Sequence, residues 1–165
     1  MHRYTGIQER HTLARAPFQV LILPYHVTTD GSYRFAIFKR SDSDVWQGLA
    51  GGGEDNETPR AAALREACEE AAIPTDSEYI ALDARASVPI VCFSDHRLWG
   101  PGLYVIPEHS FGVRLEGEDL RLSAEHTSFQ WLRYEDAYEQ LTYDSNRIAL
   151  WELNRRLNMM SGAGQ

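Results

Sequence analysis

The sequence predicts an α/β protein with several strands and about three helices. Residues 18–25 form a continuous apolar run, which suits a strand buried on both faces of a sheet. Residues 59–73 are rich in alanine, the strongest helix former. Two further segments near the C-terminus, 135–141 and 146–157, are also helix-like. Both kinds of element occur in a chain of 165 residues, a length typical of one domain with a sizeable core.

Composition and charge indicate the domain organisation, the partners and the location to expect. We expect an N-terminal arm at residues 1–16, one domain at 17–158 and a flexible tail at 159–165. The net charge of −8 and the pI near 5.2 argue against stable nucleic-acid binding. The two cysteines, Cys68 and Cys92, suggest no disulfide framework, which favours a reducing, cytoplasmic location. No apolar run reaches transmembrane length, so we expect no membrane partner.

The remaining strands are predicted from short apolar or alternating segments bounded by turn residues. A turn signal at 29–32 precedes an alternating segment at 33–39, as in a returning strand. The glycine-rich segment 51–53 is predicted to be a turn that allows positive φ and a close backbone approach to a ligand. We expect a break at 107–109. Further strands are predicted within 79–92 and at 103–106, 111–115, 120–122 and 129–132.

The helix after the glycines has clear boundaries. Thr58 is a good N-cap residue, Pro59 suits the first helical position, and Pro74 stops the helix. Four apolar positions at helical spacing predict the face that packs on a sheet, which makes Cys68 a small core residue. These positions are Leu64, Ala67, Cys68 and Ala71.

Three carboxylates of this helix, Glu66, Glu69 and Glu70, are predicted to lie on roughly the opposite side. Like charges at i and i+4 are unfavourable, and the helix dipole disfavours anions in the last turns. Arg65 offsets only part of this charge. A hard divalent cation with oxygen ligands would offset the remainder. The alternative is that these residues form an ordinary solvated acidic face.

The spacing of the charged residues favours the cation. Gly51 is followed after five residues by Glu57, and after seven more by the segment 65–73, REACEEAAI. This pattern resembles the signature of the Nudix hydrolase family, Gly-x5-Glu-x7-Arg-Glu-U-x-Glu-Glu-x-Gly-U, in which U is a bulky aliphatic residue. Every charged position matches, whereas Ala67 replaces a bulkier aliphatic residue and Ala72 replaces the second glycine. The resemblance implies an α/β/α sandwich with a mixed β-sheet.

The resemblance also implies roles for individual residues. The expected ligands of Mg²⁺ or Mn²⁺ are the carboxylates of Glu66, Glu69 and Glu70 and the backbone carbonyl of Ala50. In some members the residue at the position of Glu66 orients or deprotonates the attacking water. Glu57 and Arg65 resemble supporting residues of the catalytic site, since an Arg–carboxylate fork can fix the helix against the preceding loop.

Outside the signature, Glu125 belongs to a Glu-His pair before a Trp-containing strand, where many family members have a Glu that contacts metal or water. An exposed Glu-His pair can equally be solvated and have no catalytic role. We assign four residues near the glycine-rich segment to substrate binding: Arg40, Trp46, Gly51 and Gly52.

These features predict a Mg²⁺- or Mn²⁺-dependent pyrophosphohydrolase. Its expected substrate is a small nucleoside triphosphate or a related nucleotide-like diphosphate. The C-terminal run, above all residues 144–147, resembles bacterial members that act on dihydroneopterin triphosphate or nucleoside triphosphates. Pro89 leaves hydrolysis of ADP-ribose or a nucleotide sugar as an alternative, and a non-catalytic nucleotide-binding sensor is another. Short edge strands leave a homodimer open as well.

Overall fold

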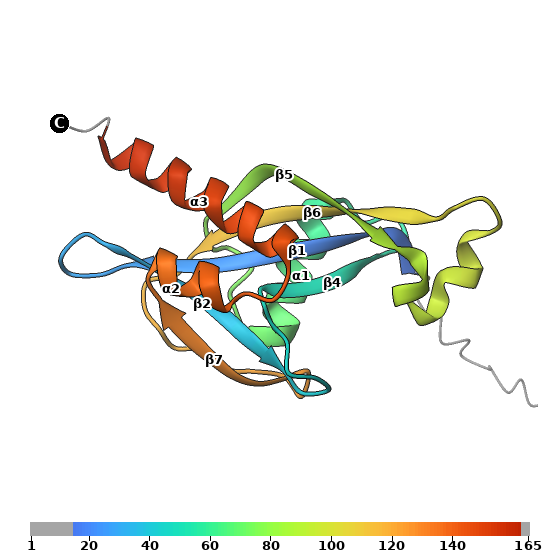
Figure 1. Ribbon diagram of the computed structural model, residues 1–165, viewed down its shortest axis with the longest axis horizontal. Coiled ribbons are helices and arrows are strands. Elements are labelled where there is room, and N and C mark those ends of the chain that lie inside the picture. The colour runs from blue at the N-terminus through green and yellow to red at the C-terminus, as the bar shows by residue number, and fades with distance from the viewer. Residues whose placement is uncertain (1–14, 163–165) are drawn as a thin grey trace, which may run out of the picture.

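The structure is a computed structural model that describes residues 15–162, so most of the predicted N-terminal arm lies outside the described residues. Within this range the chain folds into one mixed sheet of seven strands with helices on both faces (Figure 1). The strands are β1 (Arg15–Val27), β2 (Tyr33–Arg40), β3 (Trp46–Gln47), β4 (Leu49–Glu54), β5 (Tyr79–Pro89), β6 (Val105–Arg114) and β7 (His126–Leu132). The helices are α1 (Pro59–Ala71), α2 (Tyr134–Gln140) and α3 (Asp144–Gly162), with short 3₁₀ helices η1 (Ile90–Cys92) and η2 (Ser94–Trp99) after β5.

The long strand β1 organises the sheet. It pairs in parallel with β6 on one side and antiparallel with β4 and β2 on the other. α1 covers one face, while α2 and α3 cover the opposite face (Figure 1). The predicted α/β/α sandwich with a mixed sheet is therefore confirmed.

The apolar run in β1 follows from this position between two layers. Val20 and Ile22 pack into the core beneath α1, whereas Leu21 and Leu23 pack into the core beneath α2 and α3. Successive side chains of a strand point to opposite faces, so a strand covered on both faces is apolar at every position. The predicted strand at 18–25 is confirmed and extends further at both ends.

The glycine-rich segment 51–53 is a strand, which contradicts the predicted turn. It lies within β4 and pairs with β1, with Gly51 opposite Val20. Among the described glycines, positive φ occurs elsewhere, at Gly31, Gly100 and Gly102. β4 requires glycine at these positions because glycine has no side chain. Neighbouring side chains occupy the space where a Cβ would lie.

Two other strand predictions were wrong. β6 continues through Pro107, because β1 pairs with β6 only from Glu108 onward and Pro107 lies beside β5 alone, where a proline is tolerated. Residues 120–122 form no strand. Instead, the N–H groups of Arg121 and Ser123 donate to the C=O groups of Ala71 and Glu70, so this loop satisfies the C-terminal end of α1.

α3 extends beyond the predicted end at residue 157 and includes residues 159–162, which the sequence suggested were part of a tail. Polar side chains continue the helix, since Asn158 donates to the C=O of Asn154 and Ser161 donates to the C=O of Leu157. No helix within residues 15–162 is long and apolar enough to cross a membrane.

Glu152 joins α3 to an irregularity in β5. Its carboxylate accepts the N–H groups of Asp83 and Ala84 at 2.7 Å each and the Nε–H of Arg156 at 2.7 Å. The β5–β6 register shifts at this point, which leaves those N–H groups outside the ladder. Burial acts to raise the pKa of Glu152, but these hydrogen bonds together outweigh it and lower the pKa.

Candidate active site

The ends of α1 are defined by its backbone hydrogen bonds. Thr58 Oγ1 accepts the N–H of Ala61 at 3.2 Å, so the predicted N-cap is confirmed. At the C-terminal end, Ala72 adopts a left-handed conformation with φ of 55°, and the N–H of Ile73 donates to Ala67 O at 3.2 Å. An alanine therefore holds the conformation that favours glycine, at a strain of about 1–2 kcal/mol.

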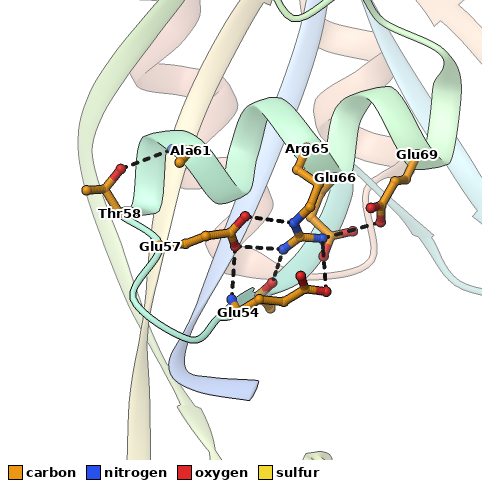
Figure 2. Close-up of polar contacts among 8 residues, drawn as sticks. Glu54, Glu57, Thr58, Ala61, Arg65, Glu66 and Glu69 are labelled. Carbon is orange, nitrogen blue, oxygen red and sulfur yellow. Dashed lines mark hydrogen bonds and ion pairs between the residues drawn. The ribbon is translucent and has the colours of Figure 1, made fainter. Parts of the chain in front are cut away.

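Arg65 ties the helix to the strand before it (Figure 2). Its Nε and one terminal nitrogen donate to the two carboxylate oxygens of Glu57 at 2.8 and 2.9 Å. The same terminal nitrogen donates to the C=O of Gly52 at 2.8 Å. The other terminal nitrogen donates to Glu66 at 2.9 Å and to Glu69 at 3.3 Å. It also lies 3.7 Å from Glu54 Oε1 as an ion-pair partner, so one guanidinium connects four carboxylates and the backbone of β4.

Glu57 completes this connection from the loop side. Its carboxylate also accepts the N–H of Glu54 at 2.9 Å, which closes the loop between β4 and α1 (Figure 2). The hydrogen bonds from Arg65 lower the pKa of Glu57, although burial acts in the opposite direction. Glu57 is therefore ionised at neutral pH and functions as a support for the helix.

Glu70 and His126 form a buried pair. His126 Nε2 and Glu70 Oε2 lie 2.9 Å apart, and the two side chains are only 2% and 3% exposed. Burial raises the pKa of Glu70, and the hydrogen bond to His126 opposes this rise. His126 Nδ1 is also buried and has no partner within residues 15–162.

The packed face of α1 differs from the predicted one. Ala67 and Ala71 are buried as expected, but Cys68 is exposed and Glu70 is buried. The packed stripe is therefore rotated by about one residue. The physical reason is that alanines occur on several sides of this helix, so that the apolar direction is poorly defined by the sequence.

Glu66 lies directly over Gly51. A Cβ on Gly51 would lie 2.0 Å from Cδ of Glu66, so only glycine leaves room for this carboxylate. The Glu66 side chain is 13% exposed. Burial raises its pKa to about 7, against the lowering effect of Arg65.

A cavity of about 300 Å³ gathers most of the predicted site residues. It is lined by Arg15, Gln19, Arg40, Gln47, Ala50, Gly51, Gly52, Glu66, Glu70, Cys92, Phe93 and Glu125. Seven of these were assigned from the sequence to metal binding, catalysis or substrate binding. Glu125, far from the helix in sequence, is exposed at this cavity.

Four predicted residues do not line the cavity; Glu57 and Arg65 instead hold α1 against β4, and the other two lie elsewhere. Glu69 is exposed and faces Arg65. Trp46 is partly buried against the core beneath α2 and α3, and its backbone N–H donates to Thr142 Oγ1 at 3.0 Å. The assignment of Trp46 to substrate binding therefore gains no support from its position.

The sequence analysis missed Arg15 and Gln19. Arg15 places its guanidinium 4.4 Å from the centre of the Phe93 ring, and its Nε is buried with no partner in the described part of the chain. Burial lowers the pKa of Arg15, and nearby Glu66 acts in the opposite direction. Both residues belong to β1 and had no motif to mark them, because Arg15 fell in the predicted arm.

A second cavity, of about 560 Å³, adjoins the first. The two cavities share Gln19, Arg40, Cys92 and Phe93. The other residues of the second cavity are Asp42, Ser43, Ala86, Ser87, Val88, Pro89, Glu108, Tyr143, Ser145 and Asn146. A ligand that extends from one cavity into the other would pass Arg40 and Phe93.

The donor set fits a hard cation. Within residues 15–162, no three His, Cys, Asp or Glu side chains already converge as a metal site needs. However, Glu66, Glu70 and the Ala50 backbone line one cavity, and oxygen donors of this kind suit Mg²⁺ or Mn²⁺. Burial raises the pKa of both carboxyls, and Arg65 and His126 oppose this rise.

Comparisons with known proteins identify the family. The NUDIX domain family model matches residues 25–151. The dihydroneopterin triphosphate diphosphatase of Escherichia coli K12 is 31% identical over 139 residues, which cover 82% of this chain and 91% of that protein. The RNA pyrophosphohydrolase of Roseobacter denitrificans is 30% identical over 140 residues, covering 76% and 87% of the two chains.

Among solved structures, one from Listeria monocytogenes described as a NUDIX hydrolase has a TM-score of 0.79 and 40% identity, and the match covers 88% of this chain and 97% of that one. The fold and the helix of carboxylates define a hydrolase of phosphoric anhydrides. The chain belongs to the Nudix family.

Proposed function

We propose that this protein is a Mg²⁺- or Mn²⁺-dependent pyrophosphohydrolase that cleaves a phosphoanhydride bond of a nucleoside triphosphate or a related compound. The observation that carries the proposal is the cavity that Glu66 and Glu70 share with Arg15 and Arg40. Carboxylates and arginines on one cavity suit a metal–polyphosphate ligand, whose charges are both positive and negative.

The metal would be held by Glu66, Glu70 and the carbonyl of Ala50. Glu69 would join them only by leaving its ion pair with Arg65. When bound, the cation supplies charge neutralisation at the phosphates and activation of water. His126 holds Glu70 in place at 2.9 Å and limits its rotation.

The other residues of the cavity orient the substrate and handle the proton. Arg40 and Arg15 bind phosphate oxygens, although Arg40 first has to exchange its present partner, Asp42. Glu125 is exposed and is our candidate for the group that accepts a proton from the attacking water. Arg65 and Glu57 keep the helix at a fixed distance from β4, which preserves the geometry that the reaction needs.

Dihydroneopterin triphosphate is the first substrate to test, because the Escherichia coli relative is named for its hydrolysis. The name of the Roseobacter relative makes a 5′-triphosphate of RNA a second candidate. The net charge of −8 counts against RNA, since phosphate chains bind best to basic surfaces. ADP-ribose tests the alternative activity, which is hydrolysis of ADP-ribose or a nucleotide sugar.

The test is a release assay with Mg²⁺ on dihydroneopterin triphosphate, all (d)NTPs, a 5′-triphosphorylated RNA and ADP-ribose. Glu70→Gln should lose on the order of 100-fold or more in kcat/KM, because it removes a charged ligand but keeps the side-chain shape. Glu139→Gln makes the same chemical change at an exposed position of α2 and should be fully active. A chelator should abolish turnover, and Mg²⁺ or Mn²⁺ should restore it.

Three results would contradict the proposal. Turnover that resists the chelator, or a fully active Glu70→Gln variant, would exclude the metal assignment. If the protein hydrolyses none of these substrates but binds a nucleotide tightly, it is a binding module and not an enzyme.

A further inference from the structure

A buried carboxylate, Glu108, lines the second cavity. It belongs to β6 and is 4% exposed. Gln19, its neighbour on the parallel strand β1, donates from Nε2 to Glu108 Oε2 at 2.6 Å. Burial raises the pKa of Glu108, and the hydrogen bond from Gln19 opposes this rise.

The surroundings of Glu108 leave it short of hydrogen-bond donors. An ionised carboxylate has two oxygens and about four acceptor sites, and burying it is unfavourable unless donors fill them. Within the described residues the Glu108 carboxylate has one side-chain hydrogen bond, from Gln19 to Oε2, and Oε1 remains open to a donor from the cavity. Because Glu108 also lines a cavity, a ligand can supply the missing donors.

The second cavity has the position and size to hold the group attached to the phosphates. It shares Gln19, Arg40 and Phe93 with the cavity of Glu66 and Glu70. Its volume of about 560 Å³ lies in the range of small-molecule sites. A substrate with its phosphates beside the arginines would therefore place its heterocycle against Glu108.

The heterocycle that matches an ionised carboxylate has two parallel N–H donors on one edge. The 2-amino-4-oxopyrimidine ring has such an edge, formed by its ring N–H and its 2-amino group, and it occurs in guanine and in pterins. Adenine and cytosine place an amino group beside an unprotonated ring nitrogen, which repels a carboxylate. Uracil and thymine have one N–H between two carbonyl groups, and these carbonyl oxygens also repel a carboxylate.

We propose that Glu108, positioned by Gln19, is a specificity-determining residue that accepts two hydrogen bonds from a 2-amino-4-oxopyrimidine edge of the substrate. This inference rests on the proposed function, because it places the phosphates in the first cavity. Gln19 fixes one oxygen of the carboxylate and leaves the group oriented for a planar ligand. Sites that hydrogen-bond a substrate donor reject analogues that lack it strongly, so a preference of about 100-fold or more is expected.

The experiment compares dGTP, dITP and dATP with dihydroneopterin triphosphate. Hypoxanthine keeps the ring N–H of guanine and lacks the 2-amino group, so the ratio of dGTP to dITP isolates one donor. The wild type should favour dGTP and dihydroneopterin triphosphate over dITP, and dITP over dATP. The ratio of kcat/KM between dGTP and dihydroneopterin triphosphate separates a nucleotide enzyme from a pterin enzyme.

Glu108→Gln replaces one acceptor oxygen by an NH₂ donor and should bring the ratio of dGTP to dITP close to one. Glu116→Gln is the matched control, since the Glu116 side chain is 94% exposed and lies outside both cavities. Melting temperatures of both variants check the fold. If Glu108→Gln does not fold, the wild-type series decides alone: equal kcat/KM for dGTP and dATP would overturn the proposal.

Calorimetric binding of GMP, IMP and AMP separates this inference from the proposed function. A preference for GMP that disappears in Glu108→Gln supports the role of Glu108 even if no triphosphate is hydrolysed. Hydrolysis with an unchanged preference in Glu108→Gln would refute the role of Glu108 and leave the proposed function standing.

Discussion

Replacing Gly51 by alanine should reduce activity strongly while leaving the fold intact. The added Cβ would lie 2.0 Å from Cδ and 2.3 Å from Oε1 of Glu66. Ordinary carbon–carbon contacts are about 3.5–4.0 Å, so the Glu66 carboxylate has to move by roughly 1.5 Å. Glu66 is a flexible side chain, and it can move at the expense of its hydrogen bond to Arg65 at 2.9 Å.

The expected magnitudes follow from this displacement. A shift of about 1 Å in a catalytic geometry can reduce the rate on the order of 100-fold, which corresponds to about 2.7 kcal/mol of transition-state stabilisation. Losing one hydrogen bond between Arg65 and Glu66 destabilises the fold by only about 1–2 kcal/mol. For a chain of this size that lowers Tm by roughly 2–8 °C.

The assay measures kcat/KM and Tm for Gly51→Ala beside two control variants. Gly112→Ala places a Cβ 2.5 Å from Cδ1 of Leu153, in the core under α3, and should lower Tm while sparing kcat/KM per folded molecule. Gly117→Ala meets no atom within 4 Å and should change neither quantity. An unchanged kcat/KM in Gly51→Ala would contradict the displacement of Glu66, as would a loss of activity that Gly112→Ala reproduces at equal stability.

Three further predictions concern stability. Ala72→Gly should raise Tm by a few degrees, because relief of about 1–2 kcal/mol of left-handed strain exceeds the entropic cost of a more flexible unfolded chain. A lower Tm would contradict the presence of this strain. Arg65→Lys should lower Tm by roughly 4–8 °C and should also lower kcat/KM, since an ammonium cannot bind both oxygens of Glu57 as the guanidinium does. Wild-type values of both quantities would show that the paired hydrogen bonds between Arg65 and Glu57 do not support the site. The lowered pKa of Glu152 contributes stability that is present above its unfolded pKa of about 4.3 and is lost as pH falls through the folded value. Denaturant titrations of Glu152→Gln should therefore show a deficit at pH 7 that shrinks below about pH 4, and a deficit independent of pH would oppose this.

Features that depend on neighbours along the chain could be predicted from the amino-acid sequence alone. The N-cap at Thr58, the alanine-rich helix and the spacing of Glu57 from Arg65 are local, because capping and i, i+4 contacts act within one or two turns. The same spacing identified the family and placed Ala50, Glu66 and Glu70 together as candidate metal ligands, all of which line the first cavity. The apolar run of β1 likewise revealed a strand buried on both faces, since burial on both faces requires apolar residues at every position.

Which polar groups are buried, and which ones contact one another, depends on how the whole chain packs. The rotation of α1 that buries Glu70 and exposes Cys68 depends on packing against the sheet, because its alanines fit on more than one side. Gln19 and Glu108 are 89 residues apart in sequence, and the parallel pairing of β1 with β6 makes them neighbours. Such contacts follow from strand order and register, which are set by the whole sheet and leave no pattern in either segment alone.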